Sequence, residues 1–396
     1  MSKLEELLNK LCSDGVEFIK LDKCLSYEQP TKYIVKCKDY IETGLPVLTA
    51  GQTFILGYTD ETEGVFNASK DNPVIIFDDF TTSFHWVDFD FKIKSSAMKM
   101  LRPRADMSIS FRFVYYAMKC IKYQTLEHSR QWISKYSQLE IPLPPIEVQN
   151  EIVRILDCFT QLEAELEAEL DCRKRQYEFY RDQLLSFDKI TPPERNNVVW
   201  MPITEVFEMR NGYTPSKNKP EYWEGGKIPW FRMEDIRQNG RILSDSIQHI
   251  TMDGVKKGNL FKANSFILAT TATIGEHALV IADSLANQRF TNLSVRKSLK
   301  DRIIIKFLFH YMFIIDDWCK NNVNISGFAS VDMNKFKKLE IPIPPIEEQN
   351  RIVAILDRFE SLTTSLQHGL PAEIAARRQQ YEYYRDKLLD FKRKTA

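Results

Sequence analysis

Apolar residues recur at three- and four-residue spacings through one long stretch of the chain, residues 146–187. This spacing is typical of the buried face of an α-helix. The stretch has 42 residues, which correspond to roughly 63 Å of unbroken helix. Pro144 and Pro145 precede it and favour a helix start, because proline is tolerated in the first helical turn. The pattern therefore predicts one unusually long helix that begins at these prolines.

A second stretch repeats the same apolar spacing after Pro344 and Pro345. Gly369 and Pro371 fall inside it, and both residue types weaken or interrupt a helix. We therefore expect a kink or a break at that point. The two long helices are expected to pack on each other in antiparallel fashion. The alternative is that each helix covers only its own domain.

Short runs rich in β-forming residues, bounded by Gly, Pro, Asn and Asp, precede each long helix and predict strands. An aromatic-rich stretch near the end of each half predicts a helix. The expected fold class is therefore α/β, with mixed strands and helices in each half. The predicted strand regions are 44–58, 72–82, 266–275 and 277–284, and the predicted helices lie at 110–121 and 305–313.

The chain contains an internal duplication. Sixteen of 21 positions are identical between LEIPLPPIEVQNEIVRILDCF (139–159) and LEIPIPPIEEQNRIVAILDRF (339–359). Nine of 12 positions are identical between QYEFYRDQLLSF (176–187) and QYEYYRDKLLDF (380–391). An unrelated pair of segments would match at about one position, so one fold is carried twice.

Between the repeated blocks the two halves diverge, yet landmarks survive in the same order. This pattern predicts a pseudo-two-fold repeat in which one scaffold carries two different surfaces. The aligned pairs are 16–21 with 198–203, 46–48 with 229–231, and 74–82 with 265–273.

Residues 162–170 read LEAELEAEL, which is the unit Leu-Glu-Ala-Glu repeated in tandem. The second copy of the duplication is four residues longer between its matched blocks, and four residues add roughly 6 Å, about one helical turn. A length change of one turn keeps the apolar face in register but moves the parts attached to the helix ends. The helix pair is therefore interpreted as a ruler that sets the distance between those parts. The alternative is a solvated, Glu-rich helix face.

Composition places the chain among ordinary globular proteins. Its 396 residues are 43% apolar and 27% charged, and this length favours more than one domain. The 54 basic and 54 acidic residues give no net charge. The chain therefore lacks the excess charge of a lone nonspecific nucleic-acid binder, and any DNA contact must come from local patches or be shared with a partner.

The cysteines and the N-terminal residues indicate a cellular location. Seven cysteines are scattered along the chain without a C-x-x-C pair, which is typical of reduced cytosolic thiols. The first residues are too short a run for a signal peptide, and no apolar stretch approaches about 18 residues. We therefore expect a cytoplasmic protein with no membrane contact.

Motifs for independent catalysis are absent from the sequence. It has no G-K-[ST] phosphate loop and no histidines at metal-ligand spacing, so no catalytic, cofactor-binding or metal-binding residue is predicted. Asp78-Asp79 is the best candidate for a metal-binding pair. The matching place in the second half reads Thr270-Thr271, however, so hydrogen bonding to DNA or a role in loop structure is favoured.

Basic residues concentrate in one patch in each half, at 91–104 and 286–300. Such patches suit phosphate contacts, while Gln, Asn, Arg and Thr in nearby loops suit the reading of base edges. Each patch taken singly is also typical of a solvated face. The basic residues are Lys92, Lys94, Lys99, Arg102 and Arg104, and in the second half Arg289, Arg296, Lys297 and Lys300.

The chain combines duplicated blocks, variable segments and a tandem tetrapeptide, and the blocks read LEIP-x-PPIE-x-QN-x-IV-x-ILD-x-F and QYE-x-YRD. With this combination the chain resembles a type I restriction-modification specificity subunit over essentially its whole length. The resemblance implies two target recognition domains joined by two long helices packed as an antiparallel coiled coil. Each domain would read one half of a bipartite, asymmetric DNA site. The implied regions are recognition domain 1 (1–138), helical region 1 (139–187), a linker (188–195), recognition domain 2 (196–338) and helical region 2 (339–396).

The resemblance also implies that the chain is not catalytic. Two methyltransferase subunits would dock on the helical regions and transfer methyl groups from S-adenosylmethionine to adenine N6, and each adenine must leave the base stack for this reaction. Restriction subunits would add ATP-driven translocation and cleavage. S-adenosylmethionine, ATP and magnesium are thus expected on partners and none in this chain. The alternatives are a stand-alone DNA methyltransferase or nuclease with an unrecognised active site, and a coiled-coil assembly protein without a DNA role.

The resemblance places DNA contacts in the loops that follow the first strand of each half, and we add polar residues from the later loops. The predicted DNA-binding residues of the first half are Tyr27, Gln29, Thr31, Lys32, Tyr33, Thr49, Gln52, Thr81, Thr82 and Lys99. Those of the second half are Tyr213, Thr214, Ser216, Lys217, Arg232, Thr271, Thr273, Gln288 and Arg289.

Overall fold

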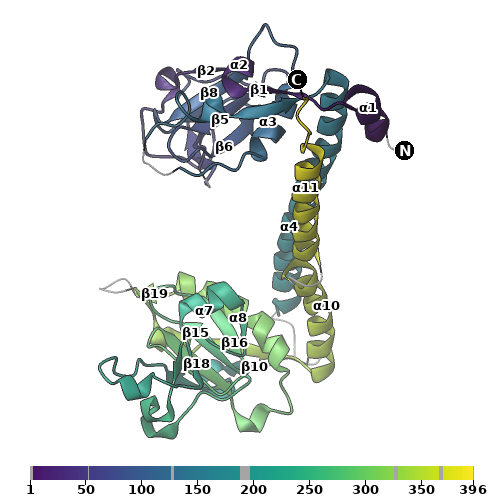
Figure 1. The fold of residues 1–396 in the computed structure, drawn as a ribbon. Helices are drawn as coiled ribbons and strands as arrows, with labels where there is room; N and C mark the ends of the chain where they lie inside the picture. Colours follow the sequence, from purple (N-terminus) through teal and green to yellow (C-terminus); the bar gives the residue numbers. More distant parts are fainter. Residues whose placement is uncertain are drawn as a thin grey trace. The chain divides into compact units, whose positions relative to one another are not determined.

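The structure is a computed structural model, and its described residues form two compact units (Figure 1). Unit 1 comprises Met1–Glu167 and Glu373–Ala396, and unit 2 comprises Ala168–Ala372. Each unit therefore contains one variable part of the sequence together with segments of both repeated helical regions. The described residues are 3–51, 53–125, 129–187, 197–324, 329–364 and 369–395.

The long helices agree with the sequence pattern. Helix α4 spans Ile146–Leu185, 40 residues, and begins directly after the proline pair. In the second copy, α10 spans Ile346–Thr364 and α11 spans Leu370–Leu388. The predicted interruption is confirmed, and Gly369 has a φ of 111°, a backbone conformation that favours glycine.

Within unit 1, α11 runs antiparallel to α4. The rings of Phe159 and Tyr384 stack with centroids 5.5 Å apart, and one turn further along α4, Glu163 binds Arg378. Contacts further along α4 are thus made with earlier residues of α11, as expected for antiparallel helices. Figure 1 shows the two helices lying side by side. The predicted antiparallel packing of the long helices is confirmed.

The main sheet of unit 1 is antiparallel with the strand order β2-β8-β5-β6. Helix α3, Phe111–Lys119, covers one face, and its buried Phe113 and Tyr116 share a core with Ile75 and Leu101 of the sheet. A smaller sheet with the order β4-β3-β7 completes the variable part of unit 1. The strands are β2 Leu25–Glu28, β3 Leu45–Leu48, β4 Ile55–Thr59, β5 Val74–Asp78, β6 Phe84–Val87, β7 Lys92–Ile93 and β8 Met98–Pro103.

The main sheet of unit 2 follows the same plan, with the strand order β11-β18-β15-β16-β13. Helix α8, Ile305–Asn321, covers it as α3 covers the sheet of unit 1, and Phe307 packs with Phe266 and Leu293 in one core. A smaller sheet has the order β14-β12-β17. The strands are β11 Phe207–Asn211, β12 Ile228–Phe231, β13 Ile242–Leu243, β14 His249–Ile250, β15 Ser265–Ala269, β16 His277–Val280, β17 Leu285–Ala286 and β18 Phe290–Val295.

Strand pairing confirms the first aligned pair of segments, 16–21 with 198–203. Strand β1 pairs with β9 so that Glu17 opposes Leu143, and β10 pairs with β21 so that Val199 opposes Ile343. The predicted α/β fold class with a pseudo-two-fold internal repeat is confirmed. The remaining elements are β1 Glu17–Lys20, β9 Glu140–Leu143, β10 Val199–Pro202, β19 Val323–Asn324, β20 Ser330–Val331, β21 Glu340–Ile343, α1 Lys3–Leu11, α2 Leu21–Cys24, α6 Ile203–Val206, α7 Met233–Asn239 and α9 Met333–Phe336.

The repeated block forms a joint between the variable part of each unit and its long helix. In unit 1, buried Gln149 donates from Nε2 to the Pro144 carbonyl at 2.7 Å and accepts from the Ser110 backbone N–H at 2.9 Å. Ser110 begins α3. The carboxamide therefore satisfies one backbone group before α4 and one at the start of α3, both of which would otherwise lack partners.

The same joint recurs in unit 2 with different surroundings. Buried Gln349 donates to the Pro344 carbonyl at 2.8 Å and accepts from the Ile304 N–H at 2.8 Å. Ile304 begins α8 as Ser110 begins α3. Backbone hydrogen bonding thus explains why the same glutamine occurs in two otherwise different halves.

The aspartate of the repeated ILD motif fastens the next turn of each joint. Asp157 accepts from Arg112 Nε at 2.8 Å and from the Tyr116 hydroxyl. Asp357 lies 2.8 Å from His310 Nε2 in unit 2. Counting from the shared joint, His310 occupies the place of Tyr116. The same aspartate of the repeat therefore contacts two different helices, α3 in unit 1 and α8 in unit 2.

Among the described residues, no helix combines the length and the apolar character that a membrane span requires.

Candidate nucleic-acid interface

Three polar side chains form a hydrogen-bonded chain at the end of the main sheet of unit 2. Thr291 Oγ1 donates to Asn211 Oδ1 at 3.1 Å and shares a 3.1 Å hydrogen bond with Thr270 Oγ1. Asn211 and Thr291 oppose each other on β11 and β18, and Thr270 follows the last residue of β15. Three neighbouring strands therefore place these groups together.

A cavity of about 570 Å³ opens beside this hydrogen-bonded chain. Its described lining includes two basic residues and no Asp or Glu. Hydroxyl and carboxamide groups both donate and accept hydrogen bonds, so such a surface suits the mixed donor and acceptor pattern of base edges. The lining residues are Met209, Arg210, Asn211, Thr270, Thr271, Gln288, Thr291, Ser330, Val331, Met333 and Lys337.

The corresponding positions of unit 1 carry charges. Lys99 Nζ donates to Gln29 Oε1 at 3.0 Å and lies 3.4 Å from Asp79 Oδ2. The side chains of Lys99 and Asp79 are both fully buried. Burying these polar groups is costly unless each has a partner, so this contact fixes the end of the sheet.

Strand register establishes that these positions are equivalent. Phe77 opposes Lys99 in unit 1, and Leu268 opposes Thr291 in unit 2. Asp79 lies two residues after Phe77, and Thr270 lies two residues after Leu268. We call these positions the sheet-end site, which consists of Gln29, Asp79 and Lys99 in unit 1 and of Asn211, Thr270 and Thr291 in unit 2.

Asp79 is held from several directions. Its Oδ1 accepts from the backbone N–H of Gln131 at 3.1 Å and of Trp132 at 2.8 Å. Its Oδ2 faces Lys99 and, at 3.6 Å, Arg130. The interpretation of Asp79 as a residue of loop structure is confirmed, whereas direct hydrogen bonding to DNA is wrong for this buried carboxylate. The sequence alignment of Asp78-Asp79 with Thr270-Thr271 was also one residue off.

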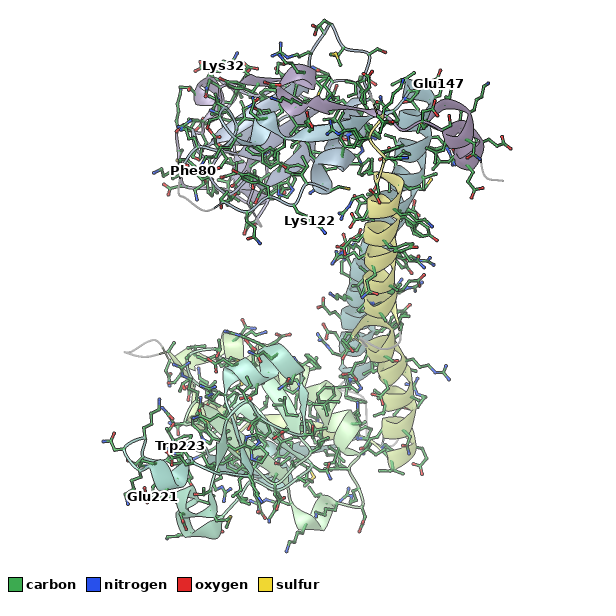
Figure 2. All side chains as sticks on the ribbon, in the orientation of Figure 1. Lys32, Phe80, Lys122, Glu147, Glu221 and Trp223 are labelled. Carbon is green, nitrogen blue, oxygen red and sulfur yellow. The ribbon has the colours of Figure 1, made fainter. Side chains whose placement is uncertain are left out.

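The end of β5 lies away from the long helices. Figure 2 labels Phe80, which follows Asp79, on the side of unit 1 remote from α11. In unit 2, Figure 2 labels Trp223 on the side remote from α10. In each unit the labelled residue therefore lies away from the long helix of that unit.

The interpretation of Lys99 as a DNA contact is wrong. Its ammonium is fully buried against Asp79. The proposed basic patch at 91–104 is reduced further because Lys92 is also buried, with its ammonium 2.9 Å from Glu61. Local sequence lacks acids here, but strand pairing brings acids from elsewhere in the chain.

Other predicted residues of unit 1 surround the sheet-end site or the neighbouring turn. Tyr27 on β2 is 42% exposed. Thr31 and Lys32 are exposed, and Lys32 and the Tyr33 hydroxyl both bind Glu28, at 2.7 and 2.8 Å. These residues form one connected surface after β2.

The remaining predicted residues of unit 1 lie in turns. Thr81 Oγ1 donates to Ser83 Oγ at 3.2 Å, and Thr82 adopts a φ of 61°, an uncommon conformation for a β-branched residue. Thr49 Oγ1 accepts from the Gly51 N–H at 3.3 Å, which makes it a turn-forming residue. Gln52 lies outside the described residues.

In unit 2 the predicted loop after β11 packs on the second sheet. The Tyr213 carbonyl accepts from Trp230 Nε1 at 3.0 Å, and the Ser216 carbonyl accepts from Trp223 Nε1 at 3.0 Å. Thr214 Oγ1 donates to Gln288 Oε1 at 2.6 Å, and Lys217 is exposed. This loop is therefore braced by indole groups and connected to the sheet-end cavity.

Of the later predicted residues of unit 2, Thr271 and Gln288 line the cavity, and Arg289 is exposed beside them. Arg232 instead begins α7, where its backbone N–H donates to Asp235 at 2.6 Å. Thr273 Oγ1 is buried without a hydrogen-bond partner among the described residues. Thr271, Gln288 and Arg289 thus lie at or beside the cavity. Arg232 and Thr273 instead belong to the local structure of their own segments.

Sequence reasoning missed Asn211, Thr291, Arg130, Ser330 and Lys337. The first two lie within strands, where the alternation of side chains decides whether a polar residue faces a cavity or the solvent. That alternation could have been read only after the strand pairs were known.

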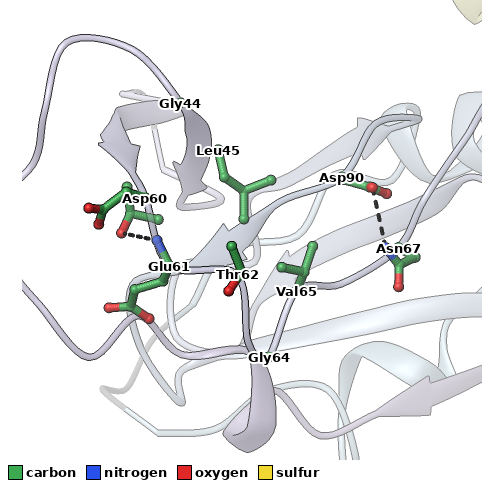
Figure 3. Close-up of a pocket in the computed structure, with 10 residues that line it drawn as sticks. Gly44, Leu45, Asp60, Glu61, Thr62, Gly64, Val65, Asn67 and Asp90 are labelled. Carbon is green, nitrogen blue, oxygen red and sulfur yellow. Dashed lines mark hydrogen bonds between the residues drawn. The ribbon is translucent and has the colours of Figure 1, made fainter.

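A cavity of about 640 Å³ in unit 1 has the opposite electrostatic character. Figure 3 shows Asp60, Glu61 and Asp90 around it, with Asn67 donating to Asp90 at 3.2 Å. Backbone N–H groups hold the pKa of Glu61 below its ordinary value, and Lys92 adds to this effect. A carboxylate-rich lining would repel DNA phosphates, so this cavity does not suit phosphate contacts.

One cluster in unit 2 has the donor set of a metal site. The ligand atoms of His310, Asp357 and Glu360 all lie within 4.8 Å of one another. However, Lys306 Nζ lies 3.5 Å from Asp357 and 3.4 Å from Glu360. The ammonium already supplies the positive charge, so the cluster is explained as part of the joint between α8 and α10.

Exposed aromatic residues mark the repeated helices in both units. Phe179 is 64% exposed and Tyr383, its counterpart in the repeat, is 60% exposed. The next residue in each case stacks on the opposite helix: Tyr180 on Phe359 in unit 2, with centroids 5.5 Å apart, and Tyr384 on Phe159 in unit 1. Two equivalent apolar surfaces therefore face solvent on the described structure.

The family profile described as Type I restriction modification DNA specificity domain matches two segments of the chain, residues 26–171 and 196–376. The match covers most of the chain and occurs once in each half. It agrees with the internal duplication.

Two curated relatives are similar to the chain over long stretches. The type I restriction enzyme EcoR124I/EcoR124II specificity subunit of Escherichia coli is 45% identical over 410 residues, which cover 99% of this chain and 97% of that protein. The type I restriction enzyme EcoprrI specificity subunit of Escherichia coli is 53% identical over 202 residues, 49% of this chain and 50% of that protein. Similarity to the first therefore extends over both halves.

Solved structures support the fold. The type I restriction-modification S subunit from M. genitalium has 15% identity and a TM-score of 0.50, covering 95% of this chain and 96% of that chain. A chain from a study of complex assembly and conformational transition of the type I R-M system has 17% identity and a TM-score of 0.58, covering 95% and 97%. These similarities show the fold, with two mixed α/β parts and long helices.

Proposed function

Since the chain belongs to the type I restriction-modification DNA specificity family, we propose that it reads DNA for a complex whose methyl transfer and cleavage are performed by other subunits. It is a DNA-recognition subunit of the type I class. Each of its two recognition parts reads one half of a bipartite, asymmetric site. The finer proposals concern its regions, its partners and its lack of catalysis.

The observation that carries this proposal is one joint combined with two unlike sheet-end sites. Gln149 and Gln349 make the same backbone contacts in both units. At the sheet ends, by contrast, unit 1 has the Lys99 and Asp79 pair where unit 2 has neutral threonines. A constant frame with exchanged polar groups suits a protein that must read two different sequences.

The regions follow from the duplication. We propose residues 1–138 and 196–338 as the target recognition domains, and residues 139–187 and 339–396 as the helical regions. Residues 188–195 would link the copies. Base-reading groups are assigned to the surroundings of the sheet-end sites, and Lys217 and Arg289 are assigned to phosphate contacts.

Two methyltransferase subunits are the proposed partners of the helical regions. Phe179 and Tyr383 are exposed at equivalent positions of the repeat, so a partner that recognises one surface would also recognise the other. Large apolar side chains on a surface favour protein contact. Restriction subunits would join through the assembled complex, with double-stranded DNA as the shared ligand in the cytoplasm.

The chemistry is assigned to these partners. S-adenosylmethionine would be bound by the methyltransferase subunits, which would methylate adenine N6, and ATP and magnesium would be used by the restriction subunits. The role of this chain would be to position the target adenines by binding the bases around them, because the chemistry requires each adenine to be flipped from the stack.

Coexpression of the chain with the methyltransferase subunits of its own system, followed by methylome sequencing, tests the proposal. One bipartite, asymmetric motif with N6-methyladenine is expected. The double variant Asn211→Ala, Thr291→Ala should change one half of that motif and leave the other half intact. The variant Gln161→Ala, on an exposed part of α4, should leave the motif unchanged. A motif without two halves would contradict the proposal.

The rival function is a stand-alone methyltransferase or nuclease. Purified chain incubated with DNA, S-adenosylmethionine and magnesium distinguishes the two. Under the proposal, the chain alone produces no methylated or cleaved DNA, and the same chain with methyltransferase subunits produces methylated DNA. Activity of the chain alone would favour the rival.

A further inference from the structure

Arg130 lies at the exposed edge of the sheet-end site of unit 1. Its Nη1 is 3.6 Å from Asp79 Oδ2, and 51% of its side chain is exposed. Its guanidinium carbon lies 5.9 Å from the centroid of the Phe80 ring. A guanidinium has five N–H donors in a planar fork, so a carboxylate on one side leaves donors free on the other.

The backbone that directly follows Arg130 is held in place by hydrogen bonds. The Gln131 N–H donates to the Asp79 carbonyl at 2.7 Å. The N–H groups of Gln131 and Trp132 also donate to the Asp79 carboxylate. Trp132 is buried and contacts Phe77 with ring centroids 5.1 Å apart. Arg130 is therefore presented by a rigid segment, which reduces the entropic cost of a directional contact.

Arg130 is the source of positive potential at the surface of this site, because the charges of Lys99 and Asp79 compensate each other. Lys99 and Asp79 are both fully buried and compensate each other. Arg130 adds one positive charge at the surface of this cluster. An arginine that faces solvent from a buried ion pair favours an electron-rich ligand, and on DNA such groups are phosphates and the O6 and N7 atoms of guanine.

The equivalent position of unit 2 carries Ser330. The Val331 N–H donates to the Thr270 carbonyl at 2.9 Å, as the Gln131 N–H donates to the Asp79 carbonyl. The residue before each donor therefore occupies the same place in the fold. One unit presents an arginine there, and the other presents a serine.

We propose that Arg130 is a specificity-determining residue of unit 1 that contacts O6 and N7 of one guanine, and that unit 2 lacks this contact because it has Ser330. The inference rests on the proposed function. Rigid presentation favours a base over a phosphate, because a bidentate contact with guanine depends on orientation whereas a phosphate requires mainly charge.

The experiment compares Arg130→Lys and Arg130→Ala with the unsubstituted chain, each coexpressed with the methyltransferase subunits. Methylome sequencing of the unsubstituted complex first establishes the two half-sites, so failure of the proposed function is recognised there. In both variants, one guanine position of one half-site should accept other bases with discrimination reduced about 10-fold or more. The other half-site and the spacer should stay unchanged.

Two controls separate this role from others. Arg154→Lys changes another exposed arginine of unit 1, on α4, and should preserve the motif. Arg130→Lys keeps the positive charge beside Asp79 and so guards against misfolding of the alanine variant. An unchanged motif in Arg130→Lys would overturn the proposal. The proposal would also fail if the variants bound all DNA sequences more weakly to the same degree and the salt dependence of binding fell by the amount expected for about one lost phosphate contact.

Discussion

The side chain of Gln149 accepts a hydrogen bond from the backbone N–H of Ser110 at 2.9 Å, so a residue of the repeated block satisfies the first turn of a recognition helix. Gln149 is 1% exposed. Gln149→Leu would leave the Ser110 N–H and the Pro144 carbonyl without this partner. Unfolding in urea should show a loss of about 1–3 kcal/mol in the free energy of unfolding.

Gln349→Leu provides the matched test in unit 2, because Gln349 makes the same two contacts. It should be destabilising to a similar degree. Gln161→Leu serves as the control, since Gln161 lies on the exposed face of α4 and binds only Glu165 among the hydrogen bonds described. Equal stability of Gln149→Leu and Gln161→Leu would contradict the role assigned to the joint.

The exposed aromatic residues predict a defect in assembly without a defect in folding. Phe179→Ala and Tyr383→Ala each remove a ring that is at least 60% exposed, so the thermal midpoint of the chain should change little. The double variant should lose at least about tenfold in affinity for methyltransferase subunits, because large aromatic anchors dominate interfaces. Titration calorimetry with purified subunits measures this change.

Glu178→Ala, a substitution at the exposed residue beside Phe179, is the control for the loss of affinity. It should bind the methyltransferase subunits as the unsubstituted chain does. Tight binding by the Phe179→Ala, Tyr383→Ala chain would show that the partners dock elsewhere.

Buried His277 predicts a dependence of stability on pH. Burial lowers the pKa of its imidazole, although Asp316, 2.6 Å from Nδ1, opposes this effect, and Arg241 and His310 add to it. The folded state therefore keeps His277 neutral when the unfolded chain takes up a proton below about pH 6.5. Stability should fall as pH decreases from 7.5 to 5.5, by at most about 1.4 kcal/mol per pH unit for this group.

His277→Gln removes the titrating group and retains an N–H donor for Asp316. Urea unfolding at several pH values should show a shallower loss of stability on acidification than in the unsubstituted chain. His249→Gln changes a partly exposed histidine and should keep the original slope. The assignment fails if His277→Gln and the unsubstituted chain lose stability in parallel.

The sequence was sufficient to predict features that depend on local chemistry. Gly369 and Pro371 interrupt the second helix as expected, and the apolar runs became strands at the predicted places. Lys99 was misread because its acidic partner, Asp79, lies 20 residues earlier and reaches it only through the pairing of β5 with β8. Arg130 was missed for the same reason, since its position depends on contacts with Asp79.

The tandem tetrapeptide predicts a change in the DNA spacer. Residues 162–170 lie inside the continuous helix α4, and insertion of one Leu-Glu-Ala-Glu unit adds roughly 6 Å. At about 3.4 Å per base pair, the spacer between half-sites should grow by one or two base pairs while both half-sites stay the same. Insertion of only Ala-Glu would rotate the apolar seam by about 200° and should abolish methylation. Methylome sequencing distinguishes these outcomes, and an unchanged spacer after the four-residue insertion would favour a solvated helix face over a ruler.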